Sequence, residues 1–238
     1  MELRVRIVGA GRAGGSLAAA LAGRAAVELL GRGGHAGAAR GCDVLVLAVP
    51  DRAIAEVAAA IAPGEAVVAH MSGATGLDAL RPHPRVASLH PLVSLPDAAT
   101  GGSRLRGAWM AIAGDPLIDS LAALLEGRTF RVDDEHRVLY HATACVAANH
   151  LVALLAQVER LAALAGVPAE AFMDLAAGAL ANTATSGAAA ALTGPVSRGD
   201  WETVRRHLAA LPAGERPFYR ALAAQAAALA GRELPADL

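Results

Sequence analysis

The chain has 238 residues, with 21 basic and 22 acidic side chains and a formal net charge of −1. This length suits one large domain or two modest ones, and a charge so close to zero argues against nucleic acid or an anionic membrane as a partner. Hydrophobic residues make up 55% of the chain and aromatic residues only 3%, so the core must consist largely of alanine, valine and leucine. Every basic residue is an arginine, so no lysine is available for catalysis.

Two cysteines, Cys42 and Cys145, form neither a CxxC motif nor a disulfide framework, which favours a reduced, cytoplasmic protein. The chain starts with a strand pattern, so we expect no signal peptide. Polar residues or glycine interrupt the longest alanine-rich stretches, so we also expect no membrane span. The metal-binding residue types are not clustered at ligand spacing, and we expect no metal ion.

A glycine-rich turn near the start of the chain is the first functional motif. An apolar strand over residues 3–8 runs into a GxGxxG sequence formed by Gly9, Gly11 and Gly14, and a small-residue helix follows. This strand–turn–helix context is typical of a dinucleotide-binding site, in which the pyrophosphate lies at the helix N-terminus. Chance matches are frequent in a chain with 25 glycines, but the context favours the nucleotide interpretation. The predicted cofactor-binding residues of this turn are Gly9, Gly11, Arg12, Ala13 and Gly14.

The second strand, residues 26–30, ends beside Arg32, at the position that commonly distinguishes NAD from NADP. Glu28 lies too early in the strand to bind the ribose of NAD. An arginine at the strand end can accommodate the 2′-phosphate of NADP, so we predict NADP in preference to NAD. The alternative is that Arg32 is a solvated loop residue.

Three further strands are expected at residues 42–50, 66–70 and 85–89, and a helix at 52–61. The first is a continuous apolar run, typical of a parallel strand that is buried on both faces. These strands lead into loops that carry Pro50, Ser72 and His90. Ligands bind at the carboxyl ends of strands in such sheets, so we expect these loops to lie near the glycine turn. Val49 and Pro50 are therefore also predicted to contact the cofactor.

The rest of the chain changes from a mixed to a helical pattern. Residues 96–106 are expected to form a polar connection, followed by strands at 108–113 and 129–132 with a helix at 116–125 between them. Helices are predicted at 135–165, 169–191, 201–211 and 215–230, with a polar turn at 193–200 and Asp200 as an N-cap. We predict an α/β protein with a dinucleotide-binding domain at residues 1–132 and an all-helical domain at 133–238. The helices look too apolar and too few to cover themselves, which favours a homodimer over packing within the monomer.

A polar stripe of His141, Cys145 and Asn149 recurs every four residues on the helix predicted at 135–165. This spacing places the three side chains along one helix face. His141 could donate a proton, because the ordinary pKa of histidine lies near neutral pH, and Asn149 could hold a substrate oxygen. Ser72 and His90 are further candidate catalytic residues. For each of these residues, a hydrogen-bonded structural role is the alternative.

The glycine turn, the DVLVLAVPD strand and the helical second half resemble the superfamily of 6-phosphogluconate dehydrogenase and pyrroline-5-carboxylate reductase. The motifs SLHPLVSL, YHATACVAANHLVALL and ALTGPVSRGDWETV resemble, more specifically, an uncharacterised bacterial branch of Rossmann-like NADP oxidoreductases with a C-terminal domain of unknown function. The resemblance implies a Rossmann domain, a helical dimerisation domain and an active site where they meet.

One departure from the superfamily concerns the lysine used by its hydroxyacid dehydrogenases and ketopantoate reductases. That lysine commonly lies four residues before an asparagine on the long helix, where this chain has Cys145 before Asn149. The departure argues against hydroxyacid chemistry and leaves an imine that enters already protonated as one option, with His141 as the substitute proton donor.

The sequence therefore predicts an NADP-dependent oxidoreductase that transfers a hydride to or from a small carbonyl- or imine-bearing acid. Thr193 and Arg198, in the polar turn, are the predicted contacts to the substrate carboxylate, with an exposed turn charge as the alternative for Arg198. Two other functions stay open: a dinucleotide-binding sensor or partner subunit without turnover, and a prephenate-type dehydrogenase suggested by His90-Pro91.

Overall fold

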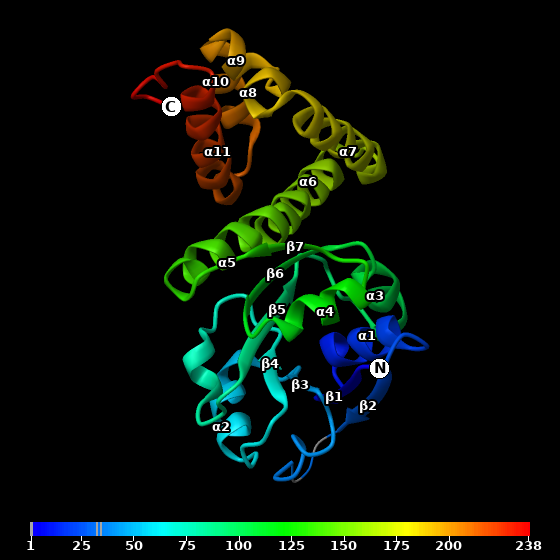
Figure 1. Ribbon diagram of the computed structural model, residues 1–238. Coiled ribbons are helices and arrows are strands. Elements are labelled where there is room, and N and C mark those ends of the chain that lie inside the picture. Colours follow the sequence, from blue (N-terminus) through cyan, green and yellow to red (C-terminus); the bar gives the residue numbers. More distant parts are fainter. Residues whose placement is uncertain (1, 32, 34) are drawn as a thin grey trace. The chain divides into compact units, whose positions relative to one another are not determined.

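The computed structural model describes residues 2–31, 33 and 35–238. The chain divides into two compact units, Met1–His150 and Leu151–Leu238. Figure 1 shows that the sheet belongs to the first unit and that the second is made of helices. The strands are β1 (Arg4–Val8), β2 (Ala26–Leu30), β3 (Val44–Leu47), β4 (Val67–His70), β5 (Val86–Pro91), β6 (Trp109–Gly114) and β7 (Arg128–Arg131).

In the described part of the chain, these strands form a seven-stranded sheet in the order β2-β1-β3-β4-β5-β6-β7. Neighbouring strands are parallel except β5 and β6, which are antiparallel. The predicted Rossmann-type α/β fold is confirmed, with this one difference in strand direction. The connection after β5 starts and ends at the same edge of the sheet, where the Leu92 amide donates to the Trp109 carbonyl at 2.8 Å. β6 therefore runs back along β5.

The helices of the first unit are α1 (Arg12–Leu21), α2 (Ile54–Ala59), α3 (Ala98–Leu105), α4 (Leu117–Leu124) and α5 (Arg137–Cys145), and a π-helical turn (Val146–His150) follows α5. They cover a sheet whose central strands are buried on both faces. Successive residues of β3 alternate between two hydrophobic clusters, with Val44 and Val46 in one and Leu45 and Leu47 in the other. This explains the continuous apolar run in the sequence.

The segment predicted as a polar connection at residues 96–106 is instead largely helical, as α3. Asp97 accepts a hydrogen bond from the Thr100 amide at the start of this helix. A Cβ atom on Gly101 or Gly102 would lie 2.0 Å from Ser16 Oγ or 2.9 Å from Ala19 Cβ, so the glycines allow α3 to pack closely on α1. This tertiary contact compensates for the low helix propensity of glycine.

The strands end with β7 at Arg131, as expected, but the two compact units meet between residues 150 and 151. The predicted boundary lies at 132/133. α5 belongs to the first unit because Arg137, its first residue, is buried and bonds to Ser88 of β5. The predicted long helix at 135–165 is present, with the π-helical turn inside it.

The second unit contains α6 (Leu151–Ala165), α7 (Ala169–Ser186), α8 (Ala188–Ala191), α9 (Pro195–Arg198), α10 (Trp201–Ala210) and α11 (Arg216–Leu229). Val196, Val204, Leu208, Ala223 and Ala227 form its core. Asp200 caps α10 as predicted, because its side chain accepts from the Thr203 amide. The predicted helix at 169–191 is interrupted at Gly187, where φ is +81°.

Apolar side chains stay exposed on α6 and α7. None of the residues of α7 is buried, and Leu164, Leu175 and Leu180 are each more than 60% exposed. The helical stretch Asp134–Ala165 is long and apolar enough, by length and composition alone, to cross a membrane, although the sequence predicted no such span. Core helices of water-soluble proteins satisfy the same two criteria, so this stretch is weak support for a membrane protein.

Candidate active site

The glycine turn lies between the end of β1 and the start of α1. Gly9 has φ +112°, and a Cβ atom there would lie 2.3 Å from the Ala48 carbonyl oxygen. Its amide donates to the Leu30 carbonyl at 2.9 Å, which ties the turn to the end of β2. The position therefore requires glycine for both backbone conformation and space.

The other two glycines of the motif have different surroundings. A Cβ atom on Gly14 would lie 1.9 Å from the Gly9 carbonyl oxygen, so α1 packs directly against the turn. Gly11, the N-cap of α1, has open space where its Cβ would lie and supplies no side-chain cap. The first amides of α1 are thus left accessible to an anion, and the turn fits the pyrophosphate of a dinucleotide.

Other predicted cofactor contacts are placed as follows. Arg12 is exposed and Ala13 half-buried at the start of α1. Val49 and Pro50 follow β3 beside Ala48, the residue packed against Gly9. Arg32, on which the choice of NADP over NAD rests, lies outside the described residues.

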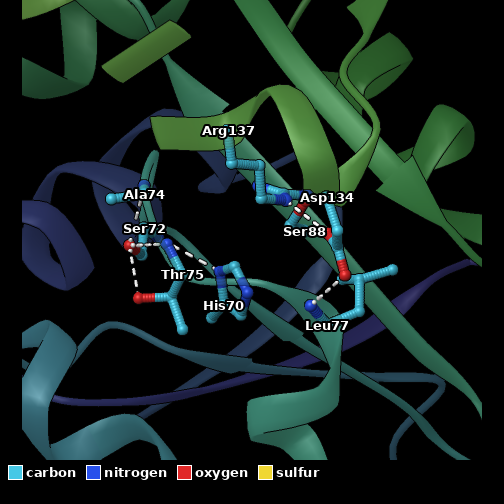
Figure 2. A network of polar contacts seen from close by, with 8 residues as sticks. All are labelled: His70, Ser72, Ala74, Thr75, Leu77, Ser88, Asp134 and Arg137. Carbon is cyan, nitrogen blue, oxygen red and sulfur yellow. Dashed lines mark hydrogen bonds and ion pairs between the residues drawn. The ribbon is translucent and has the colours of Figure 1, made fainter. Parts of the chain in front are cut away.

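Ser72 belongs to a polar network at the end of β4 (Figure 2). Its Oγ donates to Oδ2 of Asp51 at 2.7 Å and accepts from the amides of Thr75 at 3.0 Å and Ala74 at 3.2 Å. Only 6% of Ser72 is exposed. These bonds hold the loop in place and occupy the hydroxyl of this candidate catalytic residue.

A buried cation, Arg137, lies on the other side of this network (Figure 2). Its Nε donates to Oδ1 of Asp134 at 2.6 Å, and its Nη2 donates to Ser88 Oγ. Asp134 also accepts from the Leu77 amide at 2.9 Å, so the pair joins α5 to the segment after β4. Burial, together with the nearby Arg137 charge, lowers the pKa of His70 to about 4, which keeps this fully buried imidazole neutral.

Two histidine rings meet at Gly73. The ring centroids of His90 and His141 are 6.1 Å apart. A Cβ atom on Gly73 would lie 2.8 Å from Cε1 of His90 and 2.9 Å from Cδ2 of His141. The absence of a side chain at Gly73 is therefore what lets the β4 loop pack between the two imidazoles.

A cavity of about 510 Å³ opens beside these rings. His90, His141, Cys145 and Asn149 all line it, together with the Pro91–Ser94 segment. The three residues of the predicted polar stripe thus share one cavity, and His90 joins them from β5. Cys145 Sγ lies 3.9 Å from His141 Nδ1, one helical turn away.

The π-helical turn helps to keep Asn149 in this cavity. Side chains four residues apart drift around an α-helix by about 40° at each step. A π-helical turn is wider, with i→i+5 bonds, so the step from Cys145 to Asn149 offsets that drift. Such turns recur at functional sites, and the four-residue spacing of the polar stripe does not indicate this one.

Tyr140 is a residue of this site that the sequence did not indicate. Its hydroxyl lies 2.5 Å from Nδ1 of His90, and the two rings meet edge to face at 5.5 Å. Burial lowers the pKa of His90 to about 4, with the neighbouring His141 contributing, and raises the pKa of Tyr140 to about 12. At neutral pH the pair is therefore a neutral imidazole and a protonated phenol. The sequence signal that could have indicated this residue is the adjacent pair Tyr140-His141. Adjacent residues on a helix point in different directions, so Tyr140 can contact a different partner from His141.

Thr193 and Arg198 belong to the second unit, where both are exposed. Arg198 ends α9, and Thr193 precedes it. Among the described residues, Asp133, Glu135 and His136 bring potential metal ligands within 4.8 Å of one another, but all three are exposed. An exposed acidic group of this kind is not by itself a metal site.

Comparisons with known proteins agree with this architecture. Residues 111–226 match the family described as a domain of unknown function, DUF2520. No curated protein matches the chain. The solved structures that resemble it include protein TM1727 of Thermotoga maritima, with 23% identity, a TM-score of 0.75 and coverage of 95% of this chain and 98% of that one.

Two more solved structures share the fold at lower identity. A candidate NADP oxidoreductase of Bacteroides fragilis, BF3122, has 17% identity and a TM-score of 0.74, over 95% of this chain and 98% of that one. The Plasmodium falciparum pyrroline carboxylate reductase, solved with NADP bound, has 11% identity and a TM-score of 0.61, over 96% and 98%. Residues 111–226 thus match the domain of unknown function that the motifs indicated, and the chain shares the fold of these solved structures.

Proposed function

We propose that the protein is an NADP-dependent oxidoreductase that transfers a hydride to or from a small carbonyl- or imine-bearing acid. The glycine turn supports a dinucleotide, because Gly9 and Gly14 leave no room for side chains while Gly11 leaves the start of α1 open. The relatives with NADP in their names support this choice of cofactor.

The observation that carries the proposal is the cavity lined by His90, His141 and Asn149. It lies at the end of β5, on the sheet edge where β1 leads into the glycine turn, since β1, β3, β4 and β5 are parallel. Bound NADPH would supply the hydride. His141 donates the proton, Asn149 holds the substrate oxygen or nitrogen, and His90 lies beside the reacting group. Ser72 positions the loop that carries Gly73.

Three finer features are proposed from the sequence. Thr193 and Arg198 bind the substrate carboxylate, for which an arginine offers two parallel hydrogen bonds. The protein is a cytoplasmic homodimer that forms through its helical unit. The exposed leucines of α7 support this association, because a monomer would leave them in water.

The test is calorimetric titration of the full chain with NADPH and NADH, followed by assay of NADPH oxidation with pyruvate, alone and with methylamine as a source of imine. Gly11→Asp should abolish binding of both nucleotides. Aspartate is a good N-cap and preserves α1, but its carboxylate would lie where a phosphate binds. Gly37→Asp, at another open position, is the control.

Arg32→Ala should weaken NADPH about tenfold or more and leave NADH unchanged, because a charge-assisted hydrogen bond contributes about 1.5–3 kcal/mol. If neither nucleotide binds wild type at millimolar concentration, the oxidoreductase proposal fails. If the wild type binds NADPH but neither it nor His141→Ala oxidises NADPH, a binding role without turnover replaces the oxidoreductase proposal.

A further inference from the structure

The hydrogen bond between His90 and Tyr140 links two separate cavities of the first unit. His90 lines the cavity of about 510 Å³ that holds His141 and Asn149. Tyr140 lines a second cavity of about 280 Å³, together with the exposed residues Asp133 and His136. The inner cavity and the outer one are thus joined through one imidazole ring and one phenol hydroxyl, which are 2.5 Å apart.

The direction of this hydrogen bond follows from the acidity of the two groups. A neutral imidazole has one N–H and one acceptor nitrogen, and a phenol is the better donor of the two. Within the described residues, Nδ1 of His90 is the partner recorded for the Tyr140 hydroxyl. Tyr140 therefore donates to Nδ1, and His90 carries its own proton on Nε2.

We propose that His90 and Tyr140 form a proton relay that carries protons from water in the outer cavity to a substrate in the inner one. This inference rests on the proposed function. During reduction, the Nε2–H bond of His90 breaks and a bond forms from that proton to the substrate oxygen or nitrogen. Nδ1 takes the proton of Tyr140, and the phenol oxygen takes one from water in the outer cavity, which leaves a hydroxide that the solvent neutralises. One proton is consumed, which balances one hydride supplied by NADPH.

The surroundings of His90 suit a ring that stays neutral throughout. Burial disfavours a charged ring, His141, Arg137 and His70 add to this effect, and Asp51 opposes it. Arg137 is itself paired with Asp134. Burial is the largest of these effects, so a concerted transfer through the neutral ring is preferred to stepwise protonation. The relay is a second route for the single proton that reduction consumes, so His90 can donate it in place of His141, which would otherwise have to be reprotonated through the substrate cavity.

The chain contains a matched control for the relay. In the second unit, the hydroxyl of Tyr219 lies 2.7 Å from Nδ1 of His207, and those rings also meet edge to face, at 6.0 Å. Tyr140→Phe and Tyr219→Phe therefore each delete a tyrosine–histidine hydrogen bond between rings that meet edge to face, the first in the unit that carries the candidate site and the second in the other unit. Tyr140→Phe keeps the ring that contacts Phe130, so the packing is preserved.

The first measurement is ¹⁵N NMR of the imidazole nitrogens in the full chain, without cofactor. We expect His90 of the wild type to carry its proton on Nε2, to lose this fixed tautomer in Tyr140→Phe and to keep it in Tyr219→Phe. A proton on Nδ1 in the wild type would overturn the relay, because Tyr140 would then be the acceptor.

The second measurement is the rate of NADPH oxidation with pyruvate or its methylamine imine in mixtures of H₂O and D₂O. We expect a curved dependence on the deuterium fraction in wild type and Tyr219→Phe, since two protons move together. Tyr140→Phe should be about tenfold slower or more, with a linear dependence. Equal rates and equal isotope dependence in Tyr140→Phe and wild type would overturn the relay alone. Failure of the wild type to oxidise NADPH would overturn the proposed function, and the relay with it.

Discussion

The buried guanidinium of Arg137 is paired with a carboxylate, that of Asp134, which is itself half in solvent. The side chain of Arg137 is 2% exposed and that of Asp134 is 46% exposed, with 2.6 Å between Nε and Oδ1. The two partners should therefore respond differently to substitution. Asp134→Asn leaves a buried cation unpaired and should lower the free energy of unfolding by about 3 kcal/mol.

Arg137→Met should cost less, about 1–2 kcal/mol, because Asp134 can be solvated and only the Ser88 hydroxyl loses a partner. Urea unfolding measures both values, and Asp133→Asn at the adjacent exposed position is the control. A larger loss for Arg137→Met than for Asp134→Asn would contradict this account of the pair.

Gly73→Ala should abolish the proposed oxidoreductase activity without unfolding the protein. The added methyl would lie within 3 Å of both His90 and His141, so at least one imidazole must move. A displacement of about 1 Å in a catalytic group can lower the rate about 100-fold. The affinity for NADPH should change less than about twofold, because the glycine turn is untouched.

The matched control is Gly37→Ala, which adds the same methyl to the same unit in open space. Steady-state kinetics and NADPH titration of both variants provide the comparison. Full activity in Gly73→Ala would mean that the placement of the two imidazoles is irrelevant to turnover.

Neutral His70 should make the fold sensitive to mild acid. Its pKa is about 4 in the folded protein against 6.5 for an ordinary histidine, so the unfolded chain binds the extra proton between these values. Stability is therefore full above pH 6.5 and falls as the pH drops toward 4. By linkage, the loss from this residue amounts to about 2 kcal/mol at pH 5.

His70→Asn removes the titration, and the amide oxygen can still accept from the Ser72 amide as Nδ1 does. Urea unfolding at pH 7 and pH 5 should show a smaller difference in this variant than in wild type. His150→Asn, at an exposed position, should behave like wild type. An unchanged pH dependence in His70→Asn would show that this histidine is not kept neutral.

Charged substitutions on α7 should dissociate the proposed dimer. Leu175 and Leu180 are 70% and 63% exposed, and burying an arginine in place of either would desolvate a charge without a partner. Sedimentation equilibrium should give a dimer for wild type and a monomer for Leu175→Arg or Leu180→Arg. Glu170→Arg, on the same helix at a position that is already polar, should stay dimeric.

A monomeric wild type would contradict the dimer. Co-sedimentation of the wild type with phosphatidylglycerol vesicles would instead assign the apolar surface to a membrane. These outcomes are separate from nucleotide binding, which depends on the first unit.

The features that sequence predicted best depend on neighbouring residues. The three glycines of the turn and the apolar run of β3 are local patterns, and each follows from backbone sterics or burial. Asp200 as the N-cap of α10 is local as well. The shared cavity of His141, Cys145 and Asn149 follows from helical spacing, with help from the π-helical turn.

The features that sequence missed depend on contacts between distant segments. α3 is helical because Gly101 and Gly102 pack against α1. The contact between Gly101 and Ser16 joins residues that are 85 positions apart in the sequence. Tyr140 becomes part of the candidate site only through its hydrogen bond with His90, which lies 50 residues away in the sequence. In the sequence, Gly73 looks like any loop glycine. Its importance follows from the two histidines of β5 and α5 that pack against it in the fold.

The close packing of α3 on α1 has a consequence for the order in which ligands bind. α1 starts at the glycine turn, and α3 holds one wall of the inner cavity, because Arg104 donates to the Ser94 carbonyl at 3.1 Å. Ser16 of α1 also donates to the Asp97 carbonyl at the start of α3. Protein contacts alone thus brace this wall of the inner cavity against α1, so little ordering is left for the first ligand to accomplish. Substrate and nucleotide should then be able to enter in either sequence, as in a random-order mechanism.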